Sequence, residues 1–146
     1  GMKNITRQGS YQALTEALNK GECLILMTDQ DTRVKGIFMD FLGYPAYTPL
    51  GASRLLADTQ AALVPMAMTR KENGNYHFLI FPEIPTIRTD NPVADLQANT
   101  GNQNKFYSEI IRKYPAQWVW MHRRWKTTPE SLAATLKARK ESTQNK

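Results

Sequence analysis

The stretch Leu63–Phe81, LVPMAMTRKENGNYHFLIF, consists of two apolar runs separated by a short polar turn. The first run is Leu63–Thr69 and the second is Asn75–Phe81. Asn73-Gly74 lies between them, and this dipeptide is typical of a type I′ turn because both residues adopt positive φ at little cost. The sequence therefore predicts an antiparallel β-hairpin.

Two further strands are predicted upstream of this hairpin. The segment Cys23–Thr28, CLILMT, is continuously apolar, which indicates a strand covered on both faces. In such a strand Cys23 is expected to be an inert core thiol. Ile37–Gly43 reads as another strand, and the proline-rich stretch that follows, Tyr44–Gly51, is predicted to be a connection.

Helical signals alternate with these strands. Ser10 suits the N-cap of a first helix and Gly21 is placed to end it. Pro92 suits the first turn of a long helix capped by Asp90 or Asn91, whose weak middle, QANTGNQN, predicts a possible break. The predicted helical segments cover residues 11–20, 52–62 and 92–113, with a last helix from 129 and a frayed tail over about 138–146. The pattern predicts one α/β domain spanning residues 1–146, with a mixed β-sheet flanked by helices.

Composition limits the possible functions without choosing among them. The 146 residues carry a formal net charge of +6 and a sequence pI near 9.6, which favours anionic partners. One cysteine and two histidines exclude an internal disulfide and a zinc site. No segment approaches the roughly 20 apolar residues that cross a bilayer. We therefore expect no metal and no cofactor, and we read His77 as a half-buried structural residue.

Thr28–Asp31, TDQD, follows the predicted buried strand directly. Open α/β sheets place ligand sites where such strands end, so these polar residues are candidates for a binding site. A solvated loop explains the same stretch equally well.

The segment Gln117–Glu130, QWVWMHRRWKTTPE, interleaves aromatic and basic residues. Such a pattern fits a nucleic-acid surface, a phosphate pocket or a membrane-interface anchor. It also fits core tryptophans whose basic neighbours extend into solvent. The basic residues are concentrated at Arg123, Arg124 and Lys126, so a phosphate fork formed by adjacent arginines fits better than tracking of a nucleic-acid groove.

Several of these blocks, in this order, resemble the lipid A biosynthesis acyltransferases, the lauroyl and myristoyl branch of the lysophospholipid acyltransferase superfamily. The blocks are LILMTDQD, GIFMDFLGYPAYTPLGASRLLADTQAALVPMAMTRKENGNYHF and YPAQWVWMHRRWKTTPE. The resemblance runs from about Arg7 to Glu130. It implies an enzyme that transfers a fatty acyl chain from acyl carrier protein to a hydroxyl of a phosphorylated acyl-glucosamine lipid. It further implies a location on the cytoplasmic face of the bacterial inner membrane.

The resemblance also assigns roles to residues. It implies that Asp29, Gln30 and Asp31 line the mouth of the active site, with Arg7 and Arg33 as phosphate contacts. A second group, Arg123 and Arg124, would contact phosphorylated glucosamine or anionic headgroups at a membrane surface. His122 is expected to support the structure.

The family's catalytic motif, a histidine with an acidic residue five positions on, is not found. Pro82 stands at that distance from His77, and Thr127 from His122. We therefore predict that the chain has no catalytic residue of its own. By resemblance it corresponds to the C-terminal portion of an acyltransferase domain, inactive in isolation and soluble as a fragment.

Two other functions remain open at this point. The first is a non-catalytic module that binds anionic lipid or phosphosugar, and the second, nucleic-acid binding, rests on charge and HRRWK alone. The apolar strand Cys23–Thr28 is expected to leave an exposed sheet edge. We therefore predict a homo-oligomer built through this edge and the N-terminal helix.

Overall fold

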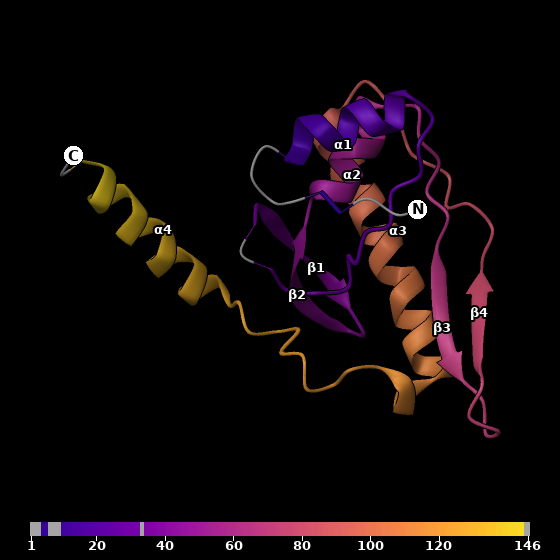
Figure 1. Cartoon of the computed structure of the whole chain (residues 1–146). Coiled ribbons are helices and arrows are strands. Elements are labelled where there is room, and N and C mark those ends of the chain that lie inside the picture. The colour runs from indigo at the N-terminus through magenta and orange to yellow at the C-terminus, as the bar shows by residue number, and fades with distance from the viewer. Residues whose placement is uncertain (1–3, 6–9, 33, 145–146) are drawn as a thin grey trace.

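The computed structural model describes residues 4–5, 10–32 and 34–144 of the 146-residue chain. These residues form four α-helices, one short 3-10 helix and four strands, arranged as two antiparallel hairpins around a long central helix (Figure 1). The α/β class predicted from the sequence is confirmed. The sheet content differs, because the described strands pair only within each hairpin and form no single mixed sheet.

The predicted hairpin forms from β3 (Met66–Arg70) and β4 (Tyr76–Ile80). Its turn differs from the prediction, because Gly74 has a positive φ of 84° and Asn73 does not. The Gly74 N–H donates to Lys71 O, and the Lys71 N–H donates to Asn75 O. The connection is therefore a three-residue loop that ends in a left-handed glycine, not a two-residue type I′ turn.

A second hairpin joins β1 (Gly36–Phe41) to β2 (Tyr44–Pro49). The sequence predicted β1, but the prediction that residues 44–51 form only a connection is wrong. Leu42 and Gly43 have φ angles of 60° and 94°, which close the chain into a tight turn. Pro45 and Pro49 are tolerated because each strand of a two-stranded sheet has an edge where no N–H is needed.

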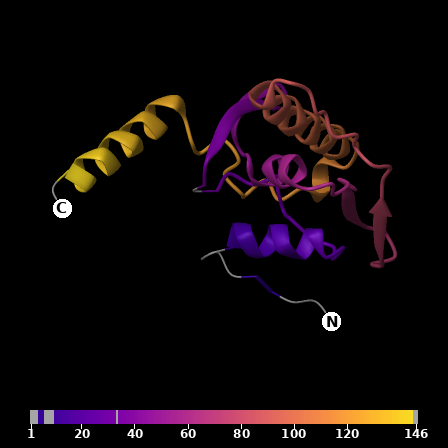
Figure 2. The same ribbon diagram turned by 90° about the horizontal axis from the view of Figure 1, so that it is seen from above.

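The central helix α3 (Pro92–Lys113) lies between the two hairpins (Figures 1 and 2). As predicted, Asn91 caps it, accepting a hydrogen bond from the Ala94 N–H. The expected break in its middle does not occur. Four polar side chains there are buried and hydrogen-bonded, which compensates for their weak helix propensity: Asn99, Thr100, Gln103 and Asn104.

The bonds of this polar stripe join α3 to its neighbours. Asn104 Nδ2 donates to Asp40 O on β1 and to Thr48 Oγ1 on β2. Thr100 Oγ1 and Gln103 Nε2 both reach the hydroxyl of Ser53, which lies on α2 (Gly51–Asp58). Tertiary contacts therefore stabilise this stretch of helix.

Helix α1 (Ser10–Asn19) forms where the sequence predicted a helix, and Gly21 follows it with φ of +78°. The structure shows that α1 packs near α2. The Tyr11 hydroxyl donates to the Asp58 carboxylate, and the Arg54 guanidinium lies 5.2 Å from the Tyr11 ring centroid. Burial, followed by the hydrogen bond to Asp58, raises the pKa of Tyr11 to about 12.

The predicted strand Cys23–Thr28 is wrong, because this segment has no regular secondary structure and pairs with none of the described strands. Cys23 is exposed, and the exposed fractions of Ile25 and Met27 are 66% and 79%. An apolar strand needs neighbours on its edges and layers on its faces, and none of the described strands pairs with it. The prediction of a buried thiol fails for the same reason.

Helix α4 (Pro129–Gln144) begins where predicted and continues past residue 138. It points away from the rest of the chain at the end of an extended linker (Figures 1 and 2). None of the described helices is long and apolar enough to cross a membrane.

Candidate functional site

Two segments far apart in the sequence meet beside the β1–β2 hairpin. Asp29 Oδ2 accepts a hydrogen bond from Trp118 Nε1 at 3.1 Å. Asp31 accepts two from Thr127, one from the backbone N–H at 2.9 Å and one from the hydroxyl at 3.0 Å. Asp29 and Asp31, which were predicted to line a site, therefore hold the segment Gln117–Glu130 in place. We call this segment the aromatic–basic segment.

Arg124 lies at the centre of this junction and is fully buried. Its guanidinium donates to Tyr47 O and Thr48 Oγ1, both at 2.8 Å, and lies 4.5 Å from the Phe41 ring centroid. Burial lowers the pKa of Arg124, while the charges of Asp31 and Asp29 act in the opposite direction. The two carboxylates thus compensate in part for the desolvation of the guanidinium.

The predicted surface fork of Arg123 and Arg124 is not formed. Arg123 is exposed, whereas Arg124 points into the protein and has no exposed surface. Neighbouring side chains on an irregular segment leave the backbone in different directions, so adjacency in the sequence did not place them together. Only Arg123 of this pair can meet a ligand from solvent.

The three tryptophans divide in a similar way. Trp118 and Trp125 pack against a core of Phe41, Ala46 and Ile111. The ring centroids of Phe41 lie 5.6 Å from Trp118 and 5.8 Å from Trp125. These two tryptophans are therefore core aromatics, while Trp120 is 54% exposed.

Three buried polar atoms of this segment have no hydrogen-bond partner among the described residues: His122 Nε2, Arg124 Nε and Trp125 Nε1. Buried polar atoms in proteins are usually paired, so this clustering is unusual. No sequence pattern indicated it, because it depends on how the segment folds back on β1 and β2. Residues 122–125 therefore contain most of the buried side-chain polar atoms that lack a hydrogen-bond partner in the described part of the chain.

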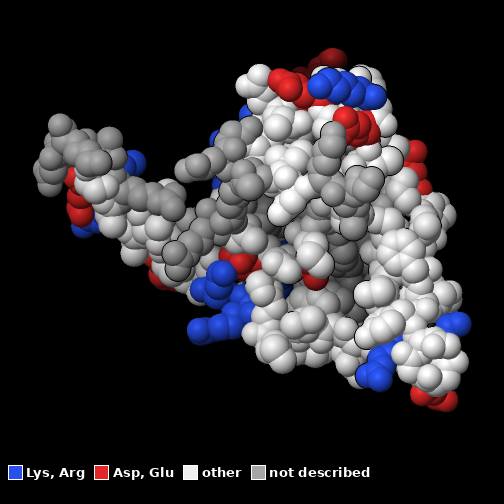
Figure 3. All heavy atoms as spheres, viewed as in Figure 1, with Lys and Arg blue, Asp and Glu red and all other residues white. Residues whose placement is uncertain are grey.

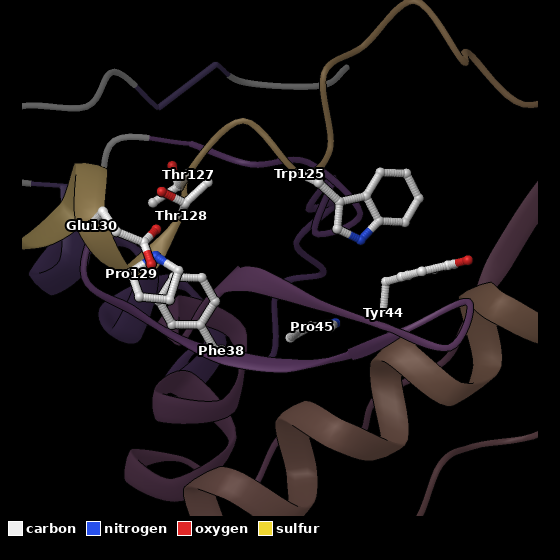
Figure 4. A pocket seen from close by; sticks show the side chains of 8 residues that line it. All are labelled: Phe38, Tyr44, Pro45, Trp125, Thr127, Thr128, Pro129 and Glu130. Carbon is white, nitrogen blue, oxygen red and sulfur yellow. The ribbon is translucent and has the colours of Figure 1, made fainter.

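A groove of about 730 Å³ opens between the β1–β2 hairpin and the start of α4 (Figure 4). Phe38 and Pro129 line one end, and Tyr44 and Trp125 line the other. Its other lining residues are Pro45, Thr127, Thr128 and Glu130. The sequence did not predict this groove, because its walls come from a hairpin and a linker that are far apart in the chain.

The remaining predicted site residues are only partly placed. Gln30 is half-buried beside Asp29 and Asp31, whereas Arg7 and Arg33 lie outside the described residues. Basic side chains lie along the lower part of the face seen in Figure 3, beside the chain that leads to α4 and at the β3–β4 tip.

The two histidines differ from each other. His122 is half-buried, while His77 is exposed on β4, so the reading of His77 as half-buried was wrong. Among the described residues, no group of three or more histidine, cysteine, aspartate or glutamate side chains could hold a metal ion.

Comparison with known proteins identifies relatives for most of the chain. The family of bacterial lipid A biosynthesis acyltransferases matches residues 1–127. The chain is 29% identical to the lipid A biosynthesis lauroyltransferase of Escherichia coli, over 89% of this chain and 42% of that protein. It is 28% identical to the phosphatidylinositol mannoside acyltransferase of Mycobacterium tuberculosis, over 88% of this chain and 39% of that protein. The chain therefore spans about two fifths of the length of these relatives.

Proposed function

Because the chain belongs to the bacterial lipid A biosynthesis acyltransferase family, we propose that it forms part of an enzyme that acylates a phosphorylated glycolipid. The acyl donor is acyl carrier protein, and the acceptor is a hydroxyl of a phosphorylated acyl-glucosamine lipid A precursor. The family match over residues 1–127 carries this proposal. The two kinds of relative are named for lipid A biosynthesis and for phosphatidylinositol mannoside, and both names are those of acyl transfer in lipid metabolism.

Within this proposal the Asp29–Asp31 segment has two roles. Asp29 and Asp31 position the segment Trp118–Thr127 through the hydrogen bonds described above. Gln30 lies between them, is half-buried and takes no part in these bonds, so it is proposed for contact with the acceptor. Arg123 is proposed as a phosphate contact because it is exposed beside the same junction. Arg7 and Arg33 are proposed as further phosphate contacts on the resemblance alone.

Arg124 has a positioning role in this proposal rather than a binding one. Its buried guanidinium ties the segment to the backbone and hydroxyl of β2. The proposal therefore separates the adjacent arginines, with Arg123 toward the ligand and Arg124 toward the core.

The chain alone is proposed to be inactive. Acyl transfer to a hydroxyl needs a base to accept the proton, and general-base catalysis typically contributes about 10²–10⁴-fold. Neither His77 nor His122 has an acidic residue five positions on. We therefore propose residues 1–146 as a single domain that supplies the acceptor side of a site completed by other elements. Its place is the cytoplasmic face of the bacterial inner membrane.

A second candidate is a module that binds anionic lipid or phosphosugar without catalysis. The exposed basic residue Arg123 beside a site without a catalytic base favours it. The two candidates differ in whether residues 1–127 can replace the matched part of an active relative.

A chimera tests this difference. Residues 1–127 are exchanged into the matched region of the E. coli lauroyltransferase, and acyl transfer from acyl carrier protein to lipid A precursor is measured. The acyltransferase proposal predicts measurable transfer that falls when Asp31→Ala is introduced, with Glu22→Ala as an exposed acidic control. A folded but inactive chimera, combined with phosphate-dependent binding of glycolipid by the chain itself, would favour the binding module. Transfer by the unmodified 146-residue chain would contradict the proposed inactivity.

The predicted homo-oligomer stays a proposal. Exposed apolar side chains at Ile25, Leu26 and Met27 support it, because they form a surface that another copy could cover. Light scattering on the chain and on Met27→Lys tests this, and a concentration-independent monomer would contradict it.

A further inference from the structure

The loop after the central helix exposes three consecutive apolar side chains. The exposed fractions of Val119, Trp120 and Met121 are 59%, 54% and 88%. Single exposed apolar residues are ordinary on protein surfaces, but a contiguous group is typical of a contact site. We call these three residues the 119–121 tip.

The tip is held in a defined shape. The Trp120 N–H donates to Trp118 O and the His122 N–H donates to Val119 O. Trp120 Nε1 also donates to Pro115 O in the short helix η1 (Pro115–Gln117). The apolar side chains are therefore presented by a folded turn.

Basic residues outnumber acidic ones among the exposed charged side chains around the tip. Residues 115–127 contain no acidic residue, and Arg123 and Lys126 are exposed. Gln117 bonds to both the N–H and the carbonyl of Arg70, which brings the β3–β4 tip with Lys71 and Glu72 alongside. On the opposite side the carboxylates of Asp29 and Asp31 are engaged by Trp118 and Thr127.

We propose that the 119–121 tip inserts into the interfacial layer of an anionic lipid bilayer, with Arg123 and Lys126 against the headgroups. Tryptophan is favoured at membrane–water interfaces, and each basic residue near an anionic surface adds about 1 kcal/mol of attraction. Three side chains are too few for a stable protein interface, which needs about 800 Å² from each partner. Binding to a bilayer does not need so large a contact area, because a few inserted apolar side chains and the attraction of nearby basic residues to anionic lipid act together.

This contact fixes the orientation of the candidate site. Trp118 adjoins the tip and bonds to Asp29, so the Asp29–Arg124 junction lies directly behind the inserted residues. This contact rests on the proposed function for the location of the chain at a lipid surface, and it adds the residues that meet that surface. It requires no acyl transfer, so vesicles without acyl substrates test it separately.

The test is sedimentation of the chain with vesicles of phosphatidylcholine containing about 30 mol% phosphatidylglycerol, compared with phosphatidylcholine alone. Met121→Asp is expected to lower the partition coefficient on the anionic vesicles about tenfold, because it places a charge where an apolar group inserts. Val93→Asp is the matched control. Val93 is 67% exposed and lies near the opposite end of α3, about 30 Å from Lys113 along the helix axis.

The charged residues are tested on the same vesicles. Arg123→Gln with Lys126→Gln is expected to weaken binding to the anionic vesicles by more than about tenfold and to leave the small uptake by neutral vesicles unchanged. Trp120→Phe is expected to lower the fluorescence quenching by brominated lipid, since Trp120 is 54% exposed whereas Trp118 and Trp125 are half-buried. Circular dichroism checks that each variant is folded.

Three outcomes would overturn the proposal. The first is absence of binding to the anionic vesicles by the unsubstituted chain. The second is an equal loss of binding in Met121→Asp and Val93→Asp. The third is concentration-dependent self-association that Met121→Asp abolishes in the absence of lipid, which would identify the tip as an interface between copies.

Discussion

Asp31 and Thr127 are joined by a pair of hydrogen bonds in which both donors belong to Thr127 and both acceptors to one buried carboxylate. The residues are 96 positions apart, so this pair fixes where the linker to α4 leaves the core. It connects the loop that follows Cys23–Thr28 with the C-terminal part of the aromatic–basic segment Gln117–Glu130. The structure of the candidate site depends on these two hydrogen bonds between Asp31 and Thr127.

Removal of the carboxylate should release the linker. Asp31→Ala is expected to lower the free energy of unfolding by about 3–6 kcal/mol, because it removes two hydrogen bonds to a charged group, which contribute about 1.5–3 kcal/mol each. Urea denaturation followed by circular dichroism measures the change. Thr127→Val keeps the backbone donor and loses the hydroxyl, so it should cost about half as much. Equal stability of Asp31→Ala and the exposed control Glu22→Ala would contradict the assignment.

The adjacent arginines give a matched comparison. Arg124→Ala removes a donor from Tyr47 O and one of the two donors to Thr48 Oγ1, and it removes the positive charge beside Asp29 and Asp31. A loss of about 3–5 kcal/mol is expected, as for other broken buried ion contacts. Arg123→Ala removes an exposed side chain and should change stability by no more than about 0.5 kcal/mol. Thermal unfolding of the two variants side by side measures the difference, and similar melting temperatures would show that Arg124 is not structural.

Two glycines should respond in opposite directions to alanine. A Cβ at Gly36 would lie 2.4 Å from the backbone oxygen of Thr48, so Gly36→Ala must separate β1 from β2. A loss of about 1–3 kcal/mol or more is expected. A Cβ at Gly51, the first residue of α2, meets nothing within 4 Å, so Gly51→Ala should be neutral or stabilising by up to about 1 kcal/mol. Denaturant midpoints decide between these expectations, and a tolerated Gly36→Ala would show that the register of this hairpin is wrong.

The pKa of Tyr11 predicts a loss of stability in alkali. The pKa is raised from 10.0 to about 12 in the folded chain, so the neutral phenol is favoured by folding. Its contribution is fully present below pH 10 and is lost as the pH rises from 10 through 12. Tyr11→Phe should remove this component of the pH dependence, while the more exposed Tyr76→Phe should retain it. The difference between the two unfolding curves across this range measures the effect, and coincident curves would contradict the Tyr11–Asp58 bond.

The exposed thiol gives a rapid check of the upstream segment. Cys23 is exposed, so it should react with a thiol reagent in the folded chain as fast as in denaturant, within about a factor of ten. Reaction that occurs only after unfolding would show that residues 23–28 are covered, as the sequence predicted.

Sequence patterns predicted the structure well where the deciding residues lie close together in the chain. They failed where a segment's structure depends on contacts with distant residues. The β3–β4 hairpin and the cap of α3 at Asn91 were predictable because the deciding residues lie within a few positions. The Cys23–Thr28 strand was wrong because its formation depends on neighbouring strands, which its own residues do not encode.

The candidate site shows the same limit. That Asp29 and Asp31 line a site stays a prediction, and the sequence did not predict their bonds to Trp118 and Thr127, which join residues about 90 positions apart. The opposite burial of Arg123 and Arg124 follows from the packing of Arg124 over Phe41, which no spacing rule contains. Pro45 and Pro49 made residues 44–51 look like a connection in the sequence. They fit in β2 because this strand pairs on one edge only.

The hydroxyl of Thr48 has one further consequence. It donates to Ala46 O and accepts from Asn104 Nδ2 and Arg124 Nη2, so its single proton and both lone pairs are used. Serine alone among the other residues carries the same aliphatic hydroxyl. Through evolutionary time this position should therefore alternate only between threonine and serine. Any lineage that abandons the hydroxyl should show accompanying replacements at 104 and 124, which would appear as covariation among three sites that are distant in sequence.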